Sequence, residues 1–144
     1  MRYTRRVRTR SRGELAEKRL AATGERVTEP RRRVLQTLIA ADQALSHTDI
    51  EQCLEPEPLD RVTLYRVLEW LVERGLAHRY AGADRVWRFM ASDSRHEAHA
   101  HFQCERCGKV RCLSEIGEAA VDVPRGYRAR RTEVTVKGDC PDCA

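Results

Sequence analysis

Residues 61–74 read Arg61-Val-Thr-Leu-Tyr-Arg-Val-Leu-Glu-Trp-Leu-Val-Glu-Arg74, and Gly75 follows them. Apolar side chains recur along this stretch at intervals of three and four residues, at Leu64, Val67, Leu68, Leu71 and Val72. This period indicates a helix with one apolar stripe, and glycine is typical just after a helix C-terminus. The side away from the stripe carries a polar set near the helix start, made of Arg61, Thr63, Tyr65 and Arg66.

The residues before this helix predict three more helices. The first spans residues 13–22, and the second begins after Thr28, a suitable N-cap residue, with Pro30 in its first turn. The third is opened by Ser46 and Asp49, whose spacing matches a capping box. Its predicted inner face makes Cys53 a buried core thiol, together with Ile50 and Leu54.

Two short strands are predicted after the helix, at residues 76–80 and 85–90. Helices followed by a two-stranded wing are typical of a winged helix-turn-helix, in which the start of the recognition helix enters the major groove of DNA. Arginine there can pair bidentately with guanine, and tyrosine or threonine can contact phosphate or a thymine methyl group. The polar set is therefore a candidate DNA contact. The alternative is that it is only the solvated side of an amphipathic helix.

The six cysteines indicate a metal site rather than a disulfide framework. Four of them form two C-x2-C pairs, Cys104 with Cys107 and Cys140 with Cys143, which is the spacing of a closed tetrahedral zinc site. A glycine after the first pair and a proline within the second suit tight turns around a metal. The alternative, a thioredoxin-like redox pair, requires a βαβ context that the sequence lacks.

The second half of the chain predicts a small α/β domain. A domain of this size buries little apolar surface and needs a bound metal for added stability. Residues 91–98 are polar and small and are expected to form a linker. Strands are expected at residues 100–104, 109–113 and 126–136, and Ser114 is expected to cap a short helix.

Histidines cluster just before the first cysteine pair and predict a second metal site. His99 and His101 lie two apart in a predicted strand and so share a face, and Cys112 lies on the next strand. Together with His96 and His78, these imidazoles and one thiolate suit zinc better than magnesium, calcium or manganese. The alternative is that the histidines are exposed loop residues and that Cys112 is a core thiol.

Composition and charge narrow the class of protein. The chain has 144 residues, a formal net charge of +5 and a mean hydropathy of -0.64. No apolar run is long enough to span a membrane or to act as a secretory signal, so the sequence predicts a cytoplasmic protein. Residues 2–12 hold arginines and no acid, which indicates either a nucleic-acid contact or a solvated tail. His47 stands apart from the other histidines and is expected on the surface.

Four stretches carry a resemblance to a known family: Arg26-Val-Thr-Glu-Pro-Arg31, Thr63-Leu-Tyr-Arg66, His99-Ala-His-Phe-Gln-Cys-Glu-Arg-Cys-Gly108 and Gly138-Asp-Cys-Pro-Asp-Cys143. They resemble the ferric uptake regulator family of metal-sensing repressors. The resemblance implies a dimer with an N-terminal winged-helix domain and a C-terminal dimerisation domain. It also implies that Thr63, Tyr65 and Arg66 contact DNA, and that the four paired cysteines hold structural zinc.

Within that family, the ligands of the second site resemble those of the zinc-sensing branch. His78 matches the hinge ligand of zinc-sensing members, and His99 and His101 match the His-x-His before the first cysteine pair. Cys112 stands where relatives have an acidic ligand. A thiolate favours zinc and would be a poor partner for an iron centre that must react with peroxide.

Two departures from the family pattern limit the number of metal sites. Phe89 stands where zinc-sensing members often have a ligand cysteine, so Cys112 or His96 would have to replace it. Whether His96 or His99 completes the regulatory site stays open. An accessory site is missing because its usual positions hold Ala98, Ala100 and Thr132. The sequence therefore predicts two zinc ions per protomer, one structural and one regulatory.

These inferences combine into one prediction of fold and function. The fold class is α+β, with a disordered basic arm at 1–12, a winged-helix domain at 13–90, a hinge at 91–98 and a small α/β dimerisation and metal-binding domain at 99–144. The expected function is zinc-responsive repression of metal-uptake genes by a homodimer that binds operator DNA and has no small-molecule substrate. An iron- or peroxide-sensing regulator of the same family is the alternative. A zinc hydrolase is disfavoured, because only Glu97 is available as a general base.

Overall fold

A computed structural model describes residues 8–41, 43–82, 84–92, 98–113, 122–130 and 132–144. The chain divides into a helical unit, Met1–Tyr80 with Trp87–Ser92, and a sheet unit, Ala81–Val86 with Asp93–Ala144. Four helices and two small sheets among the described residues confirm the predicted α+β class. No described helix is both long and apolar enough to cross a membrane.

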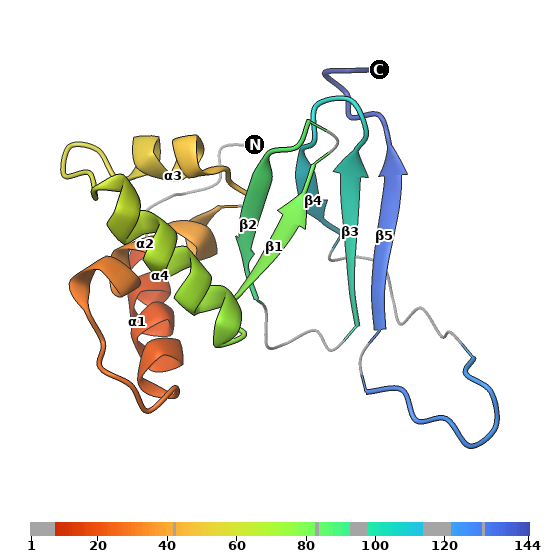
Figure 1. The fold of residues 1–144 in the computed structure, drawn as a ribbon, viewed down its shortest axis with the longest axis horizontal. Helices are drawn as coiled ribbons and strands as arrows, with labels where there is room; N and C mark the ends of the chain where they lie inside the picture. Colours follow the sequence, from red (N-terminus) through yellow and green to blue (C-terminus); the bar gives the residue numbers. More distant parts are fainter. Residues whose placement is uncertain (1–7, 42, 83, 93–97, 114–121, 131) are drawn as a thin grey trace. The chain divides into compact units, whose positions relative to one another are not determined.

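The helices of the helical unit are Arg8–Ala21 (α1), Glu29–Ala40 (α2), His47–Cys53 (α3) and Arg61–Glu73 (α4) (Figure 1). The last three begin at capping side chains. Thr28 accepts a hydrogen bond from the backbone N–H of Arg31, and Asp60 accepts one from that of Thr63. Ser46 and Asp49 form the predicted capping box, in which each side chain accepts from the backbone N–H of the other residue.

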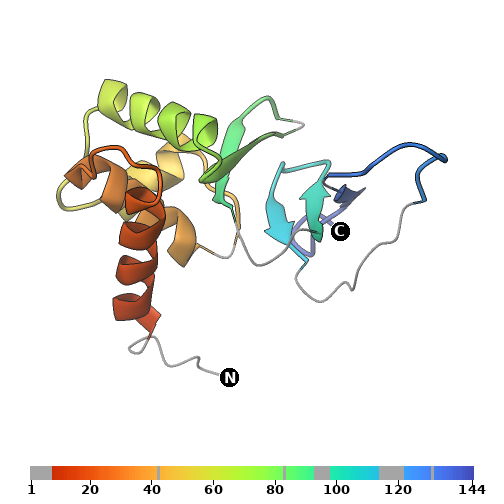
Figure 2. The same ribbon diagram turned by 90° about the horizontal axis from the view of Figure 1, so that it is seen from below.

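The apolar stripe of α4 forms the centre of the helical core. Leu64, Leu68 and Leu71 are almost completely buried. They belong to one cluster of buried residues with Leu35 and Leu38 of α2. Burying one leucine contributes about 1.5–3 kcal/mol, so this stripe strongly favours a single orientation of α4 about its axis. Figure 2 shows α4 along one side of the helical unit.

A two-stranded hairpin follows α4 and forms the wing. Gly75 ends the helix with a φ of 71°, a left-handed conformation that glycine adopts without strain. The wing consists of β1 (Ala77–Ala81) and β2 (Trp87–Ala91). Phe89 of β2 also pairs with Leu45 through two backbone hydrogen bonds of 2.8 Å. The wing is thus tied to the segment just before α3.

The sheet unit is built around β3 (Ala98–Cys104), which lies between β4 (Val110–Cys112) and β5 (Thr132–Gly138) (Figure 1). β3 and β4 are antiparallel neighbours joined by a short turn. β3 and β5 are parallel, although they are far apart in the sequence. A parallel pair requires a long connection, and the chain between β4 and β5 provides it.

Three elements differ from their predictions. Cys53 is exposed rather than buried. At about 100° per residue, position 53 lies about 80° from the middle of the stripe that Ile50 and Leu54 form, so α3 turns it outward. Helix α1 begins at Arg8 instead of Gly13, which makes residues 8–12 helical rather than disordered. Arginine is a good helix former, and no glycine or proline interrupts that segment.

The third difference is the start of β5. This strand begins at Thr132 rather than Gly126, at the position where it meets the first residue of β3. Pairing with β3 therefore decides its length, and the alternation in the sequence does not. The helix predicted after Ser114 lies outside the described residues, as do residues 93–97 of the predicted linker.

We expect Leu68→Ala to lower the free energy of unfolding of the helical unit by about 2–5 kcal/mol, because it leaves a cavity in the core. Val62→Ala, on the exposed side of the same helix, is the matched control and should change it by less than about 0.5 kcal/mol. The chain has 2 tryptophans, and both lie in the helical unit, so urea unfolding followed by tryptophan fluorescence reports on this unit. Equal unfolding midpoints for the two variants would contradict the placement of Leu68 in the core.

Candidate metal centre and nucleic-acid interface

The two cysteine pairs meet at one end of the sheet because β3 and β5 run in parallel. Cys104 is the last residue of β3 and lies opposite Gly138, the last residue of β5. The turns that follow the two strands therefore lie at the same end of the sheet. In both turns, backbone N–H groups further along the chain donate to the carbonyl oxygen of the first cysteine, Cys104 or Cys140.

The four sulfur atoms of these turns lie close enough to bind one ion. All four Sγ atoms are within 4.8 Å of one another, and those of Cys107 and Cys140 are 3.6 Å apart. Thiolates at about 2.3 Å from a tetrahedral zinc ion stand roughly 3.8 Å from each other, so the arrangement fits zinc. We call Cys104, Cys107, Cys140 and Cys143 the cysteine cluster. Four protein ligands leave no open position for a substrate, which is the form of a structural site.

Hydrogen bonds distribute negative charge unequally within the cysteine cluster. The pKa of Cys104 is lowered to about 6, first because the backbone N–H groups of Cys107 and Cys140 donate to its sulfur. The pKa of Cys143 is raised to about 12, first by its hydrogen bond with the Cys140 thiol and then by burial. Without a cation, the four thiols therefore do not all lose their protons at the same pH. A bound divalent cation would stabilise all four as thiolates.

Two ion pairs join the cysteine turns on their outer side. Lys109 Nζ lies 2.6 Å from a carboxylate oxygen of Asp142, and Arg106 Nε lies 3.3 Å from one of Asp139. Arg106 also donates to the carbonyl oxygen of Cys143 at 2.9 Å. These side chains are largely exposed, so water and salt screen the pairs. The close approach of the turns therefore depends mainly on the sheet and on the cysteine cluster.

The sheet register pairs two residues of the predicted second metal site. His101, which is buried, lies opposite Cys112 in the antiparallel ladder, and paired positions share a face of the sheet. His99 stands two positions earlier on β3 and so belongs to that face. The side chains of His99 and Cys112 and the whole of His96 lie outside the described residues. His78 is a partly buried residue of β1. Among the side chains that the structure describes, only the cysteine cluster brings three or more metal-binding groups together.

The polar set at the start of α4 lies on the surface. Arg61 and Arg66 are exposed, and 46% of Tyr65 is accessible. Thr63 is half-buried, and its hydroxyl donates to the Asp60 carboxylate at 2.6 Å. This hydrogen bond is the first cause that lowers the pKa of Asp60. Because its proton is engaged, the Thr63 oxygen is left to accept hydrogen bonds from a ligand.

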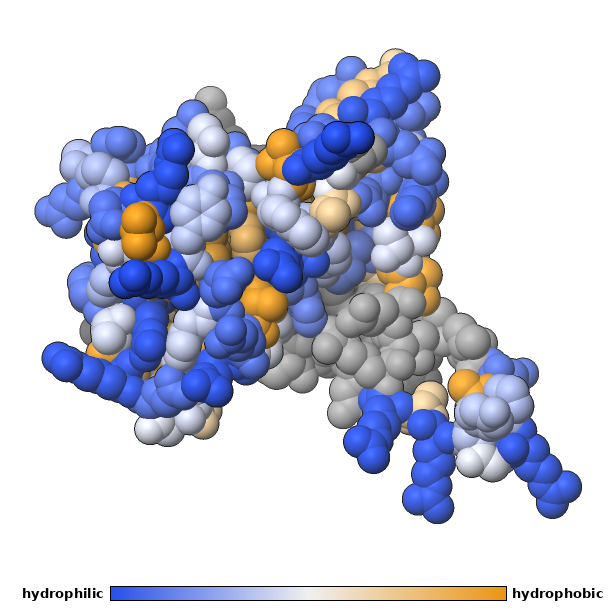
Figure 3. Space-filling view, in the orientation of Figure 1, coloured by the Kyte–Doolittle hydropathy of each residue, from blue (hydrophilic) through white to orange (hydrophobic). Residues whose placement is uncertain are grey.

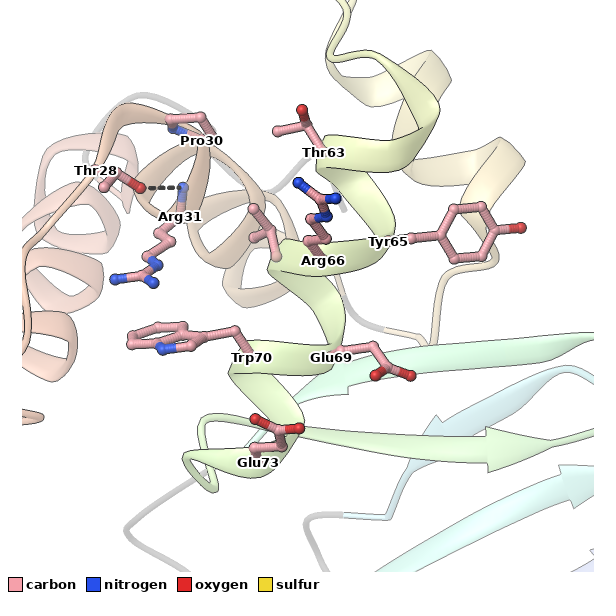
Figure 4. A pocket seen from close by; sticks show the side chains of 10 residues that line it. Thr28, Pro30, Arg31, Thr63, Tyr65, Arg66, Glu69, Trp70 and Glu73 are labelled. Carbon is pink, nitrogen blue, oxygen red and sulfur yellow. Dashed lines mark hydrogen bonds between the residues drawn. The ribbon is translucent and has the colours of Figure 1, made fainter.

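A groove of about 740 Å³ lies between the start of α2 and the exposed side of α4 (Figure 4). The guanidinium of Arg31 stacks 3.8 Å above the Trp70 ring and donates to the carbonyl oxygen of Arg26 at 2.8 Å. Trp70 Nε1 in turn donates to Glu25 at 2.7 Å. Arg66 lines the same groove. Sequence reasoning missed the Arg31–Trp70 stack, because nothing in either segment signals that α2 and α4 cross there.

His47 contacts Tyr65 instead of standing apart on the surface as predicted. The centre of its ring lies 4.0 Å from that of Tyr65 and 5.1 Å from that of Phe89. Burial lowers the pKa of His47, because it removes water from the charged form. A helical wheel gives a signal for this placement, since position 47 falls about 40° from the middle of the stripe of α3. The stripe consists only of Ile50 and Leu54, which is too few residues to predict from sequence that His47 is partly buried.

The viewed face of the helical unit is mainly hydrophilic. Figure 3 shows hydrophilic residues over α3 and α4, with apolar residues only in small separate areas. In the sheet unit, exposed arginines project from the segment between β4 and β5, at Arg125, Arg128 and Arg130. The hydrophilic face of the helical unit suits a charged partner better than an apolar one.

Known proteins resemble this chain in sequence and in fold. A model of the ferric uptake regulator family matches residues 22–137. The zinc uptake regulation protein of Escherichia coli (strain K12) is 30% identical over 136 residues, which cover 89% of this chain and 78% of that protein. The peroxide operon regulator of Bacillus subtilis (strain 168) is 28% identical over 134 residues, covering 87% and 88% of the two chains. A solved zinc uptake regulator complexed with zinc and DNA shares the fold, with a TM-score of 0.60 and 24% identity over 95% of each chain.

The family match extends over parts of both units. It includes α2, α3, α4, the wing, the first cysteine pair and most of β5. The chain therefore belongs to the ferric uptake regulator family of metal-responsive transcription regulators.

Proposed function

We propose that this chain is a zinc-responsive, sequence-specific DNA-binding repressor of metal-uptake genes that acts as a homodimer. Zinc is the proposed corepressor, with one structural and one regulatory ion per protomer. The observation that carries the proposal is the register of the sheet, which pairs Cys112 of β4 with His101 of β3. Similar proteins include both a zinc and a peroxide regulator, so the choice of zinc rests on the donor atoms of this chain.

We propose that Cys104, Cys107, Cys140 and Cys143 hold the structural zinc. The sulfur distances support this assignment. Bound zinc would supply a cross-link between four thiolates at the end of the sheet. The chain brings the two turns together through the β3–β5 pair and donates backbone N–H groups to the sulfurs. Besides the cysteines, the described part of the sheet unit buries few apolar residues, namely Ala100 and Val110, so this unit needs an added cross-link.

We propose that His99, His101 and Cys112 form the centre of the regulatory site, completed by His78 or His96. Imidazole and thiolate ligands suit zinc, whereas a harder, oxygen-rich set would be expected for manganese. His78 belongs to the helical unit and the other ligands to the sheet unit. An ion bound by ligands of both units would couple metal supply to DNA binding, and such couplings are typically about 1–3 kcal/mol.

We propose that Arg61, Thr63, Tyr65 and Arg66 contact the operator from the start of α4. The exposure of Arg61, Tyr65 and Arg66 supports this role, and so does the mainly hydrophilic face of the helical unit (Figure 3). Arginine can donate two hydrogen bonds to guanine in the major groove, which makes Arg66 a candidate for base recognition. The guanidinium of Arg31 is held by its stack on Trp70 and is suited to a phosphate beside that base.

We propose that two protomers associate through the sheet unit. Among the described strands, β5 pairs only with β3, so its other edge is open, and Val136 on β5 is 42% exposed. Open strand edges readily pair with another chain. A dimer presents two copies of α4, which suits half-sites about 34 Å apart on DNA. We further infer that the protein works in the cytoplasm, takes no small-molecule substrate and catalyses no reaction.

We expect Cys104→Ser to lose one zinc ion per protomer and to destabilise the sheet unit, because zinc affinity and folding are coupled at a closed site. Zinc content after mild chelation and the oligomeric state by gel filtration measure the two effects. Cys53→Ser changes an exposed cysteine outside the cysteine cluster and is the matched control. A Cys104→Ser protein with full zinc content and an unchanged dimer would contradict the structural assignment.

Metal dependence separates a zinc sensor from an iron or peroxide sensor. We expect binding to a duplex, selected by the zinc-loaded protein from a randomised pool, to increase with buffered zinc and not with ferrous iron. The double variant His101→Ala, Cys112→Ser should keep its fold and its structural zinc but lose this dependence. Fluorescence anisotropy of the labelled duplex measures both effects. Retention of the zinc response in the double variant, or a response to iron alone in the wild type, would overturn the zinc assignment.

We expect Arg66→Ala to weaken binding to the selected duplex by about 1–3 kcal/mol while binding to a scrambled duplex changes little, because the lost contact is to a base. Arg128→Ala removes an exposed arginine of the sheet unit and is the control. Anisotropy titrations with both duplexes measure the specificity ratio. An equal loss on the two duplexes would assign Arg66 to the DNA backbone instead.

A further inference from the structure

We infer that His47 is a positioning residue for Tyr65: its neutral imidazole is a flat support that holds the Tyr65 ring in the orientation in which it contacts a base. This inference rests on the proposed role of Tyr65 in DNA binding and adds a residue from another helix to it. Neither the family resemblance nor the spacing of the sequence motifs includes His47.

The geometry of three rings supports this role. The rings of His47 and Tyr65 have centres 4.0 Å apart and are tilted by 34°, within the range of offset aromatic stacking. Phe89 meets His47 edge-on, with centres 5.1 Å apart and an angle of 81°. His47 is therefore held between a ring of α4 and a ring of the wing. With 46% of Tyr65 still exposed, this side chain remains accessible to a ligand.

Both His47 and Phe89, the ring that packs against it, are held in place by the backbone. Phe89 is held by two backbone hydrogen bonds of 2.8 Å with Leu45. His47 is the first residue of α3, directly after the capping box that Ser46 opens. A side chain that contacts a base loses rotamer freedom when it binds. A stack that already exists in the free protein removes part of that entropy loss from the binding step.

Stability alone does not explain a histidine at this position. Its Nε2 is buried and has no hydrogen-bond partner within the described structure, which is unfavourable for a polar atom. Phenylalanine could stack on Tyr65 equally well and would leave no nitrogen unpaired. The property that histidine adds is a change of charge near neutral pH.

The charged groups around His47 define the direction of this change. Burial lowers the pKa of His47 below its ordinary value of 6.5, Glu51 of α3 opposes this shift, and Arg61 of α4 reinforces it. The other neighbours of the ring are the phenol of Tyr65 and the uncharged Phe89 of β2. Because the folded state favours the neutral ring, the support is fully present above pH 6.5. It is lost as the pH falls through the lowered pKa of His47.

The test measures binding of a duplex selected by the wild-type protein from a randomised pool, with its scrambled version as the reference. We expect His47→Ala to weaken binding to the selected duplex by about 2- to 12-fold and to leave the scrambled duplex unaffected. His47→Phe should restore wild-type binding at about pH 7.5, because it keeps the flat ring. His47→Leu, which has a similar volume and no ring face, should not restore it.

A double-mutant cycle and a pH series separate positioning from a structural role. In a Tyr65→Ala background, His47→Ala should cause no further loss if it acts through Tyr65. As the pH falls from about 7.5 through the lowered pKa of His47, the wild type should lose affinity relative to His47→Phe. The metal ligands are the same in both proteins, so their titration cancels in this comparison. Tryptophan fluorescence during urea unfolding checks that each variant keeps the helical unit folded.

The possible failures are distinguishable. If His47→Ala costs as much in the Tyr65→Ala background as in the wild type, His47 acts on α3 and the inference is overturned. If Tyr65→Ala loses affinity while His47→Ala binds like the wild type, this inference alone fails. If the zinc-loaded wild type selects no duplex at all, the proposed function fails and the inference fails with it.

Discussion

Burial of one side of α4 is the constraint on which the rest of the helical unit depends. Leu64, Leu68 and Leu71 form the centre of its core, so the helix has one stable orientation about its axis. The same orientation leaves Tyr65 on the surface beside α3 and directs Trp70 to the opposite side of the helix, toward α2 (Figure 4). Stability and the proposed contact with DNA therefore depend on one helix but on different residues of it. A substitution on the buried side and one on the exposed side should have separable effects.

The central strand of the sheet unit has a comparable role. Its parallel partner β5 brings the second cysteine turn to the first, and its antiparallel partner β4 places Cys112 opposite His101. β3 thus carries donors of both proposed metal sites, His99 and His101 along its length and Cys104 at its end. The two sites are linked through the backbone of one strand, and loss of the β3–β5 pair would separate the turns of the cysteine cluster. The sheet therefore positions donors of both proposed metal sites.

Signals that act within a few residues predicted this structure well, and contacts between distant segments could not be predicted. The caps at Thr28 and Ser46, the stripe of α4 and the spacing of the cysteines each depend on local sequence, and the corresponding elements are present. Cys53 was assigned wrongly because two apolar residues do not determine the buried side of a helix as short as α3. The stack of His47 on Tyr65 joins two helices, and the stripe of α3 is too short to predict it. The start of β5 likewise depends on its partner strand.

The order of these elements along the chain has a consequence for how the protein forms. All described helices precede β3, and their buried side chains form one core. The sheet unit is complete only when β5 has been synthesised. Cys107 and Cys140 stand 33 positions apart, so bringing them together closes a long loop and costs conformational entropy. N-terminal domains generally fold first during synthesis. The segments that form the helical core are therefore synthesised before β5, and the proposed cysteine site is complete only after β5 and the second cysteine turn have been made.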